Sequence, residues 1–484
     1  MKKIISLFIL SGLVLALLSS CSVIKVGETN ARYFGYFTET SNNANLVFKD
    51  LPTSARKVDS MVEECIKAGN MPVFDVSSIF FENGVLINRF NIIYKNYSSY
   101  FGLWENRIFA VYFDETITDS AAKEFYKIFS ADFPKIKVLA ASSAEDGFDG
   151  YISDAEKPIP DKKNLFLKTS KEGLSAAYNI SCENANVSGI FCEGISGAVY
   201  GEKILKKNAV DKQSLVASTV KYFGYYHTPG FAGSRTLYSD VAKLQNSNIA
   251  FVETGSVEGT EQLLKECKEN GFKALLYINF FFDWTGGLKS DWEEVYANYR
   301  VVFDKYKDDI FSFYVDEPKW NKIDETSFRT ATKKLREDYP EKRMLAILAY
   351  PTLEEDCASY FEYCTDLGYD VYRDQTDAER MAYLLKLVDI ASFGQELWLV
   401  PWACEINGAN EDLLVKDINE CYKLAKKYDR IVGLLPFTYA DSDIGNSIGD
   451  WGKGFMTYSN PENELYMPTL TAEHIRIGKE ICGY

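Results

Sequence analysis

Two segments of this chain end in the same acidic pair after a run of apolar and aromatic residues. The first, Phe109–Thr116, contains Asp114 and Glu115, and the second, Phe311–Pro318, contains Asp316 and Glu317. Each pattern predicts a buried strand with two carboxyl groups at its carboxyl end, where α/β proteins place their chemistry. Such a pair can divide acid–base work, because one group can donate a proton while the other orients a substrate.

An interpretation without chemistry is also open for the second pair. Acidic residues are favoured near a helix N-terminus, and Pro318 suits the first turn of a helix, so Asp316 and Glu317 could simply begin one. In the first segment Thr116 stands in place of Pro318. We interpret Asp114 and Glu115 as a degenerate site, retained for packing or glycan binding.

The two acidic segments belong to a tandem repeat. From a glycine that ends a predicted helix to the acidic pair, the two copies align without a gap. The matching segments are Arg32–Phe37 with Lys221–Tyr226, Asn45–Phe48 with Asn248–Phe251, Glu64–Gly69 with Glu266–Gly271, and Tyr94–Tyr97 with Tyr296–Tyr299. This self-similarity predicts two domains of one fold.

Strand and helix patterns alternate in the second copy, which is typical of a parallel sheet built from βαβ units. Eight such units over about 260 residues fit a closed (β/α)8 barrel. An open doubly wound sheet is the alternative, but its GxGxxG motif is absent. The predicted strands lie near 221–226, 248–253, 273–280, 310–316, 343–349, 369–372, 396–402 and 431–438, with helices at Glu325–Asp338 and Glu411–Tyr428 among others.

We therefore predict an α/β fold of two tandem (β/α)8 TIM-like barrels, of which the N-terminal one is shorter and degenerate. It has no helical pattern before its seventh strand, Asn164–Lys168. The predicted parts are a signal segment at 1–20, a tether at 21–30, the degenerate barrel at 31–212, a junction at 213–220, and the catalytic-type barrel at 221–484.

All eight strands of a barrel end at one mouth, so residues far apart in sequence can meet there. In the second copy these ends carry acids and aromatic rings, a mixture that suits sugars, because rings stack on sugars and carboxylates accept hydroxyl groups. The candidate substrate-binding residues are Tyr226, His227, Glu253, Asp283, Trp284, Tyr314, Trp402, Tyr439 and Asp441, and Glu405 is a further candidate acid. We interpret His227 as a hydrogen-bonding residue rather than a base. With only His227 and His474 in the chain, we expect no metal and no other cofactor.

Two glycosidase mechanisms fit these residues. Glu317 and Glu405 on different strands could form the carboxylate pair of a retaining enzyme, although Glu405 could equally be a solvated loop acid. Alternatively, the 2-acetamido group of the substrate is the nucleophile, which is a recognised exception to the two-carboxylate rule. Glu317 would then be the general acid and Asp316 the carboxylate that orients the acetamido group.

The second acidic segment and the C-terminal tail together resemble glycoside hydrolase family 123. The residues that carry the resemblance are Asp316-Glu317-Pro318, Trp451–Tyr458 and Met467–Glu480. The resemblance implies a barrel enzyme that acts on β-linked N-acetylhexosamine by the substrate-assisted route, with Asp316 and Glu317 as its catalytic pair. A non-catalytic glycan-binding protein is the alternative from another functional class.

Charge and the N-terminus indicate where the protein acts. The formal net charge is −16 and no basic cluster is visible, so we expect no nucleic-acid partner. Lys2 and Lys3 precede an apolar run, Ile4–Leu18, and then Leu18-Ser19-Ser20-Cys21, which resembles a bacterial lipoprotein signal. That resemblance implies export and a lipid on Cys21 that anchors the protein to a bacterial membrane.

Overall fold

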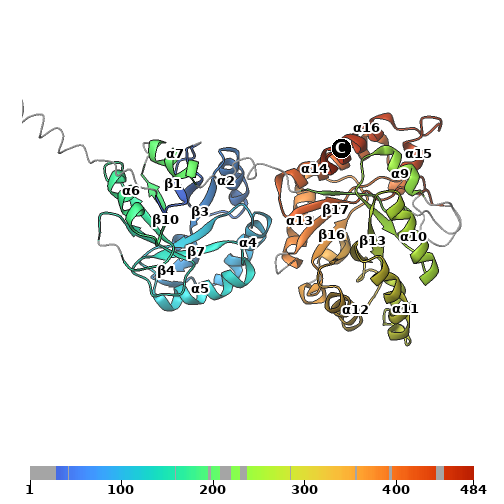
Figure 1. Ribbon diagram of the computed structural model, residues 1–484, viewed down its shortest axis with the longest axis horizontal. Helices are drawn as coiled ribbons and strands as arrows, with labels where there is room; N and C mark the ends of the chain where they lie inside the picture. The colour runs from blue at the N-terminus through green and yellow to red at the C-terminus, as the bar shows by residue number, and fades with distance from the viewer. Residues whose placement is uncertain are drawn as a thin grey trace, which may run out of the picture. The chain divides into compact units, whose positions relative to one another are not determined.

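The computed structural model describes residues 29–484 except 42, 158–159, 194–197, 208–219, 229–236, 284, 355–356, 392–394 and 443–451. The chain divides into two compact units, residues 1–94 with 107–216 and residues 95–106 with 217–484 (Figure 1). The predicted signal segment, Cys21 and nearly all of the predicted junction lie outside the described residues. Within the described residues, no helix is long and apolar enough to cross a membrane.

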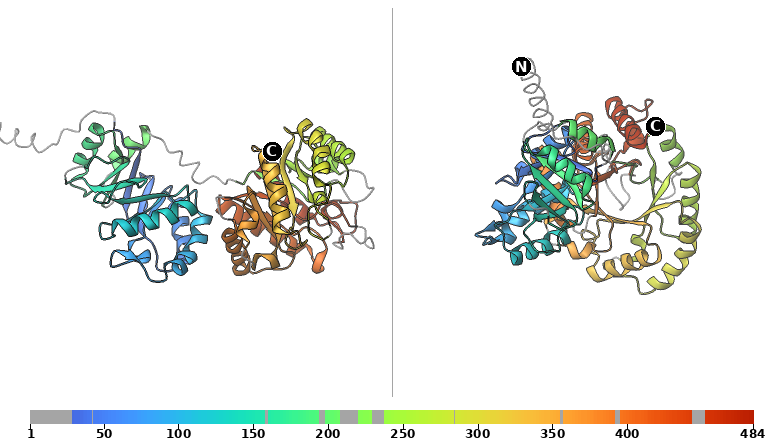
Figure 2. Two further views of the ribbon diagram at one scale, coloured as in Figure 1. Left: turned by 90° about the horizontal axis from the view of Figure 1, so that it is seen from below. Right: turned by 60° about the vertical axis from the view of Figure 1, so that its left-hand side comes forward.

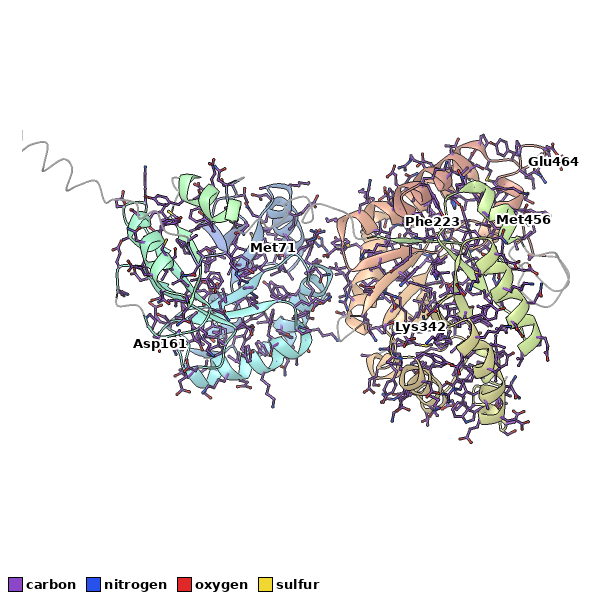
Figure 3. The ribbon with its side chains drawn as sticks, in the orientation of Figure 1. Met71, Asp161, Phe223, Lys342, Met456 and Glu464 are labelled. Carbon is purple, nitrogen blue, oxygen red and sulfur yellow. The ribbon has the colours of Figure 1, made fainter. Side chains whose placement is uncertain are left out.

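The sheet of the first unit is a closed barrel of eight parallel strands. Its strand order is β1-β10-β9-β8-β7-β6-β3-β2, and β4 with β5 forms a separate antiparallel pair. The strands are β1 (Tyr33–Phe37), β2 (Leu46–Asp50), β3 (Met71–Asp75), β4 (Phe81–Glu82), β5 (Val85–Leu86), β6 (Ala110–Phe113), β7 (Lys137–Ala141), β8 (Gly150–Asp154), β9 (Leu165–Thr169) and β10 (Val187–Cys192). Met71, at the start of β3, is labelled in Figure 3.

The helices of the first unit are unevenly distributed along its strands. They are α2 (Arg56–Lys67), α3 (Ser77–Phe80), α4 (Phe90–Leu103), α5 (Asp119–Asp132), α6 (Leu174–Glu183) and α7 (Ala198–Lys207), and the residues of α4 from Lys95 onward are grouped with the second unit. Among the described residues, no helix lies between β7 and β8 or between β8 and β9. The first copy is therefore shorter, as predicted, because it lacks helices between some of its strands. Its sheet nevertheless has all eight strands.

The sheet of the second unit also has eight parallel strands, in the order β11-β18-β17-β16-β15-β14-β13-β12. The strands are β11 (Tyr222–Phe223), β12 (Ile249–Val252), β13 (Lys273–Tyr277), β14 (Ile310–Asp316), β15 (Arg343–Ala349), β16 (Asp366–Asp370), β17 (Glu396–Val400) and β18 (Ile431–Leu434). The sixth strand, β16, begins at Asp366 and ends at Asp370, so the prediction of 369–372 was wrong.

Helices lie outside the sheet of each barrel (Figure 2). In the second unit they are α9 (Tyr238–Leu244), α10 (Val257–Glu269), α11 (Trp292–Lys305), α12 (Glu325–Asp338), α13 (Asp377–Ile390), α14 (Glu411–Lys427), α15 (Phe455–Tyr458) and α16 (Pro468–Cys482), with the 3-10 turns η1 (Asn279–Phe281), η2 (Tyr350–Glu354), η3 (Ala358–Phe361) and η4 (Ile406–Gly408). Both units have the predicted eight parallel strands with helices around them, but the strand ladders close into a barrel only in the first unit, whereas the predicted closed barrel of the second unit is nearly closed.

One asparagine joins the first two strands in each barrel in the same way. In the first, the Phe34 N–H donates to Asn45 Oδ1 at 2.9 Å. In the second, the Phe223 N–H donates to Asn248 Oδ1 at 3.1 Å, and Asn248 Nδ2 donates to the Lys221 carbonyl at 2.7 Å. No strand ladder joins β11 to β12 among the described residues, so Asn248 makes the link there.

A cation lies over two aromatic rings near the amino ends of the strands in both barrels, and we call this arrangement the cation floor. In the first barrel, Lys137 Nζ lies 5.5 Å from the Tyr33 ring centre and 4.7 Å from that of Phe109. In the second, Arg343 Cζ lies 5.6 Å from the Tyr222 ring centre and 5.5 Å from that of Phe311. Strand ends on this side of a barrel serve stability rather than catalysis.

Candidate active site

The β14 strand ends at Asp316, and the chain turns sharply at Glu317. Glu317 has a φ of 37°, a left-handed conformation that residues with a side chain adopt rarely and that is frequent at functional sites. Its backbone N–H donates to the Ile347 carbonyl on β15 at 2.9 Å. Helix α12 begins only at Glu325, with Asp324 as its cap. The interpretation of the acidic pair as the start of a helix was therefore wrong.

Hydroxyl and amide groups hold Asp316 in place. The Tyr226 and Tyr314 hydroxyl oxygens lie 2.6 Å apart, and Tyr314 donates its O–H to Asp316 Oδ1. Asn279 Oδ1 accepts the Asp316 backbone N–H at 3.1 Å, and Asn321 Nδ2 donates to the Asp316 carbonyl at 3.0 Å. Both tyrosines are buried, so this chain of hydroxyl groups fixes one oxygen of Asp316.

The pKa of Asp316 lies far above the usual value for an aspartic acid. Burial and, after it, the neighbouring acidic group of Glu317 raise this pKa to about 7, against the opposing effect of the hydrogen bond from Tyr314. Asp316 therefore changes its charge near neutral pH. Raised carboxyl pKa values of this kind are frequent in active sites.

Glu317 has a second carboxyl neighbour, Asp370, at the end of β16. Asp370 is 6% exposed, and its carboxyl group is hydrogen-bonded to that of Glu317. Burial first, and then the charge and hydrogen bond of Asp370, raise the pKa of Glu317 well above its usual range. Tyr372 donates its O–H to Asp370 Oδ2 at 2.8 Å. Glu317 is thus a carboxylic acid that keeps its proton at neutral pH, which is what a general acid requires.

His227 and Glu253 form a pair at the same mouth. His227 Nδ1 lies 3.0 Å from Glu253 Oε2, and the side chains are 12% and 28% exposed. The charges of both residues act on Asp316. Glu253 therefore fixes the orientation of the imidazole ring.

The structure places Glu405 and Asp441 in a polar loop arrangement of their own. Glu405 is exposed, and its Oε2 accepts the Lys453 backbone N–H at 3.1 Å. Asp441 accepts hydrogen bonds from the Gly454 N–H at 2.8 Å and from Thr457 Oγ1 at 2.7 Å. Over the described part of the chain, no hydrogen bond or ion pair joins Glu405 to Asp316 or Glu317.

The other predicted substrate contacts differ in how they are placed. Trp402 and Tyr439 are only 2% and 3% exposed, so protein atoms cover both rings. Asp283 is exposed, and it accepts the N–H and the O–H of Thr285 as the cap of a turn. Trp284 lies outside the described residues.

The acidic pair of the first barrel has a simpler environment. The Asp114 N–H donates to Ser77 Oγ at 3.0 Å, which matches the contact between Asp316 and Asn279. Asp114 Oδ1 accepts the N–H and the O–H of Thr116, and Glu115 is exposed. The backbone arrangement is thus shared by the two barrels, whereas Glu317 contacts a second buried acid and Glu115 is exposed.

Sequence reasoning missed Asp370, Tyr372 and Asn279. The prediction that the sixth strand covers 369–372 placed Asp370 inside the strand and hid its position at the mouth. Asp366 and Gly368 interrupt the apolar pattern of that strand. Asp366 can nevertheless be buried there, because it pairs with Arg343 and Trp398. Among the described residues, no group of three or more His, Cys, Asp or Glu side chains is arranged to hold a metal ion.

No protein-family model and no curated protein matches this chain. Among solved structures, it is similar to xylanase 10B from Thermotoga maritima, with 13% identity over 54% of this chain and 96% of the xylanase and a TM-score of 0.37. It is also similar to a β-glucuronidase of an uncultured Clostridium species, with 14% identity over 54% of this chain and a TM-score of 0.40. The alignment spans 50% of that β-glucuronidase. At these identities and TM-scores, the likeness bears on neither reaction nor substrate.

Proposed function

We propose that the second barrel is a glycoside hydrolase that acts on β-linked N-acetylhexosamine. The observation that carries the proposal is Glu317, in contact with a second buried acid, beside an oriented Asp316 at the carboxyl end of β14. A glycosidase needs an acid of this kind to protonate the leaving oxygen. The resemblance of the acidic segment and the tail to glycoside hydrolase family 123 supports the choice of substrate.

The two acids have separate roles in the proposed reaction. Glu317 donates its proton to the glycosidic oxygen as the bond from that oxygen to C1 breaks. The acetamido oxygen of the substrate attacks C1, and Asp316 accepts the acetamido N–H and stabilises the positive charge of the cyclic intermediate. Water then opens this ring, and the Glu317 carboxylate takes a proton from the water, which restores the acid. The Tyr226–Tyr314 hydroxyl chain holds Asp316 in the position that this reaction requires.

Glu405 has no role in the proposed reaction. Its carboxylate is exposed and accepts the Lys453 N–H, so nothing in its surroundings favours a covalent intermediate on this residue. We further propose that the protein is exported and anchored to a bacterial membrane by a lipid on Cys21. Replacement of Cys21 by Ser should release the protein from the membrane fraction, and the mass of the N-terminal peptide checks the lipid directly.

The test uses the full chain in detergent with chromogenic β-N-acetylglucosaminide and β-N-acetylgalactosaminide. We expect hydrolysis of at least one of them and none of the matching 2-amino sugar, which lacks the acetamido nucleophile. Glu317→Gln should abolish turnover. Equal hydrolysis of the 2-amino sugar would contradict the substrate-assisted route. Binding of glycans without turnover in a broad panel would favour a glycan-binding protein instead.

A further inference from the structure

A third carboxyl group lies beside the acidic pair of β14. Asp370 ends β16 and is in register with Ala349 of β15 and Val400 of β17, so the sheet holds its backbone on both sides. Its carboxyl group is hydrogen-bonded to the side chains of Glu317 and Tyr372 and to its own backbone N–H. Within the described residues, no lysine, arginine or histidine forms an ion pair with it. Asp370 is therefore a buried acid whose contacts are another acid and a phenol.

Two carboxyl groups in contact without a cation repel each other when both are charged, so they share one proton near neutral pH. The phenol decides which group keeps it. Tyr372 already donates its O–H to one oxygen of Asp370, and this donation stabilises the Asp370 anion. The Tyr372 ring is itself held by a stacked contact with Phe437, at 4.8 Å between ring centres. The shared proton therefore resides on Glu317, and Asp370 accepts it as a hydrogen bond.

We propose that Asp370 is the positioning residue that keeps the general acid of this barrel protonated and aimed at neutral pH. Its effect on catalysis rests on the function proposed above, whereas the shared proton does not. After Glu317 has given its proton to the leaving oxygen, its new carboxylate lies beside the Asp370 carboxylate. Repulsion between them strengthens Glu317 as a base, so Glu317 binds a proton from the incoming water while the water oxygen bonds to C1.

The groups that face this pair are few. Asp316 lies on β14, and the phenols of Tyr226, Tyr277 and Tyr372 approach from the other strand ends. Burial raises the pKa of each of these phenols well above its usual value, so all three are neutral when Glu317 titrates. The charges of His227 and Glu253 act on Asp316. Asp316 is thus the only acid near the pair, among the described residues, that titrates in the same range.

The first test is the pH profile of kcat/KM for the full-length protein. Asp370→Asn removes the charge beside Glu317 and should move the alkaline limb to lower pH by about one unit or more. Tyr372→Phe removes a stabiliser of the doubly charged state and should move the same limb to higher pH. Asp154→Asn is the matched control, because Asp154 ends the sixth strand of the first barrel, and it should leave the profile unchanged. An alkaline limb that both site variants leave in place would overturn the proposal.

The second test needs no activity. Infrared difference spectra should show a protonated carboxyl band that persists in the wild type at pH 8 and is absent from Glu317→Gln. In Asp370→Asn this band should be lost at lower pH. A band shift without hydrolysis of any glycoside would contradict the proposed function and support the proton pair. Hydrolysis with an unshifted band in Asp370→Asn would contradict the pair alone.

Discussion

The sixth strands of the two barrels end in the same residue type with opposite surroundings. In the second barrel, Asp370 is in register with Val400 and contacts Glu317. In the first, Asp154 is in register with Lys168, its side chain is 40% exposed, and its Oδ2 lies 3.9 Å from Lys157 Nζ. Asp154 thus lies beside a lysine, whereas Asp370 lies beside another acid with which it shares a proton.

The first strands differ in a related way. In the first barrel, Phe37 occupies the position that Tyr226 occupies in the second. The first barrel therefore lacks the hydroxyl group that, in the second, contacts Tyr314 and through it Asp316. Lys168 Nζ lies 4.9 Å from the centre of the Phe37 ring and 3.8 Å from Glu193 Oε1. Lysines thus accompany the acids Asp154 and Glu193 in the first barrel, whereas Asp370 of the second contacts another acid and a phenol.

The largest expected difference between the two barrels is in the effect on kcat of replacing the glutamic acid of each acidic pair. Glu317→Gln should lower kcat by a factor of about 10²–10⁴, the usual contribution of a general acid. Glu115→Gln should leave kcat unchanged, because Glu115 is exposed. Steady-state kinetics on a chromogenic N-acetylhexosaminide measures both. Loss of activity in Glu115→Gln would place catalysis in the first barrel.

The next largest expected effect is on the pH dependence of the unfolding free energy. The pKa of Asp316 rises from its usual 3.8 to about 7 on folding, so the folded protein holds a proton that the unfolded chain releases. The stabilisation by neutral Asp316 is complete below about pH 4 and is lost as pH rises through about 7. Asp316→Asn should remove this loss of stability. The difference in unfolding free energy between the variant and the wild type should therefore shift in favour of the variant by on the order of 2–4 kcal/mol from pH 4 to pH 8.

Thermal unfolding of the full chain at a series of pH values measures this effect. Glu115→Gln is the control from the first barrel, and its unfolding temperature should follow that of the wild type. A constant difference between Asp316→Asn and the wild type at every pH would contradict the buried, neutral state of Asp316.

Exchange of the first-strand aromatic residue has a smaller expected effect. Tyr226→Phe installs the residue that the first barrel carries and removes one hydroxyl from the chain to Asp316. The lost hydrogen bond corresponds to about 1 kcal/mol, or roughly a fivefold to tenfold fall in kcat. The reciprocal Phe37→Tyr should not change kcat. A full loss of activity in Tyr226→Phe would mean that the phenol itself takes part in the reaction.

The smallest expected effect concerns the asparagine shared by the two barrels. Asn45→Ala and Asn248→Ala each remove the side chain that links the first two strands, at about 1 kcal/mol or more of unfolding free energy. Asn45 is the more buried of the two, so its loss should cost more. Urea unfolding monitored by circular dichroism compares them. A larger loss in Asn248→Ala would show that the open side of the second sheet depends on this link.

The sequence predicts the fold well where local patterns are strong. The β14 strand and helix α12 have the predicted bounds, because an unbroken apolar run and an Asp cap mark them. The β16 strand was misplaced because its buried Asp366 pairs with Arg343, a contact between strands that no local pattern contains. The same error concealed Asp370. The pKa shifts at Asp316 and Glu317 also depend on burial and on neighbours from other strands, so the sequence could supply the acids but not their protonation.

The cation floor has a consequence for how such a barrel can change. Lys137 with its two rings and Arg343 with its two rings hold equivalent places, although the mouths above them have diverged. Stability and chemistry therefore reside at opposite ends of each strand. For protein engineering, this makes the first barrel a folded scaffold with a replaceable rim. Exposed residues at that rim, such as Glu115, can be exchanged while Lys137 and its two rings stay in place.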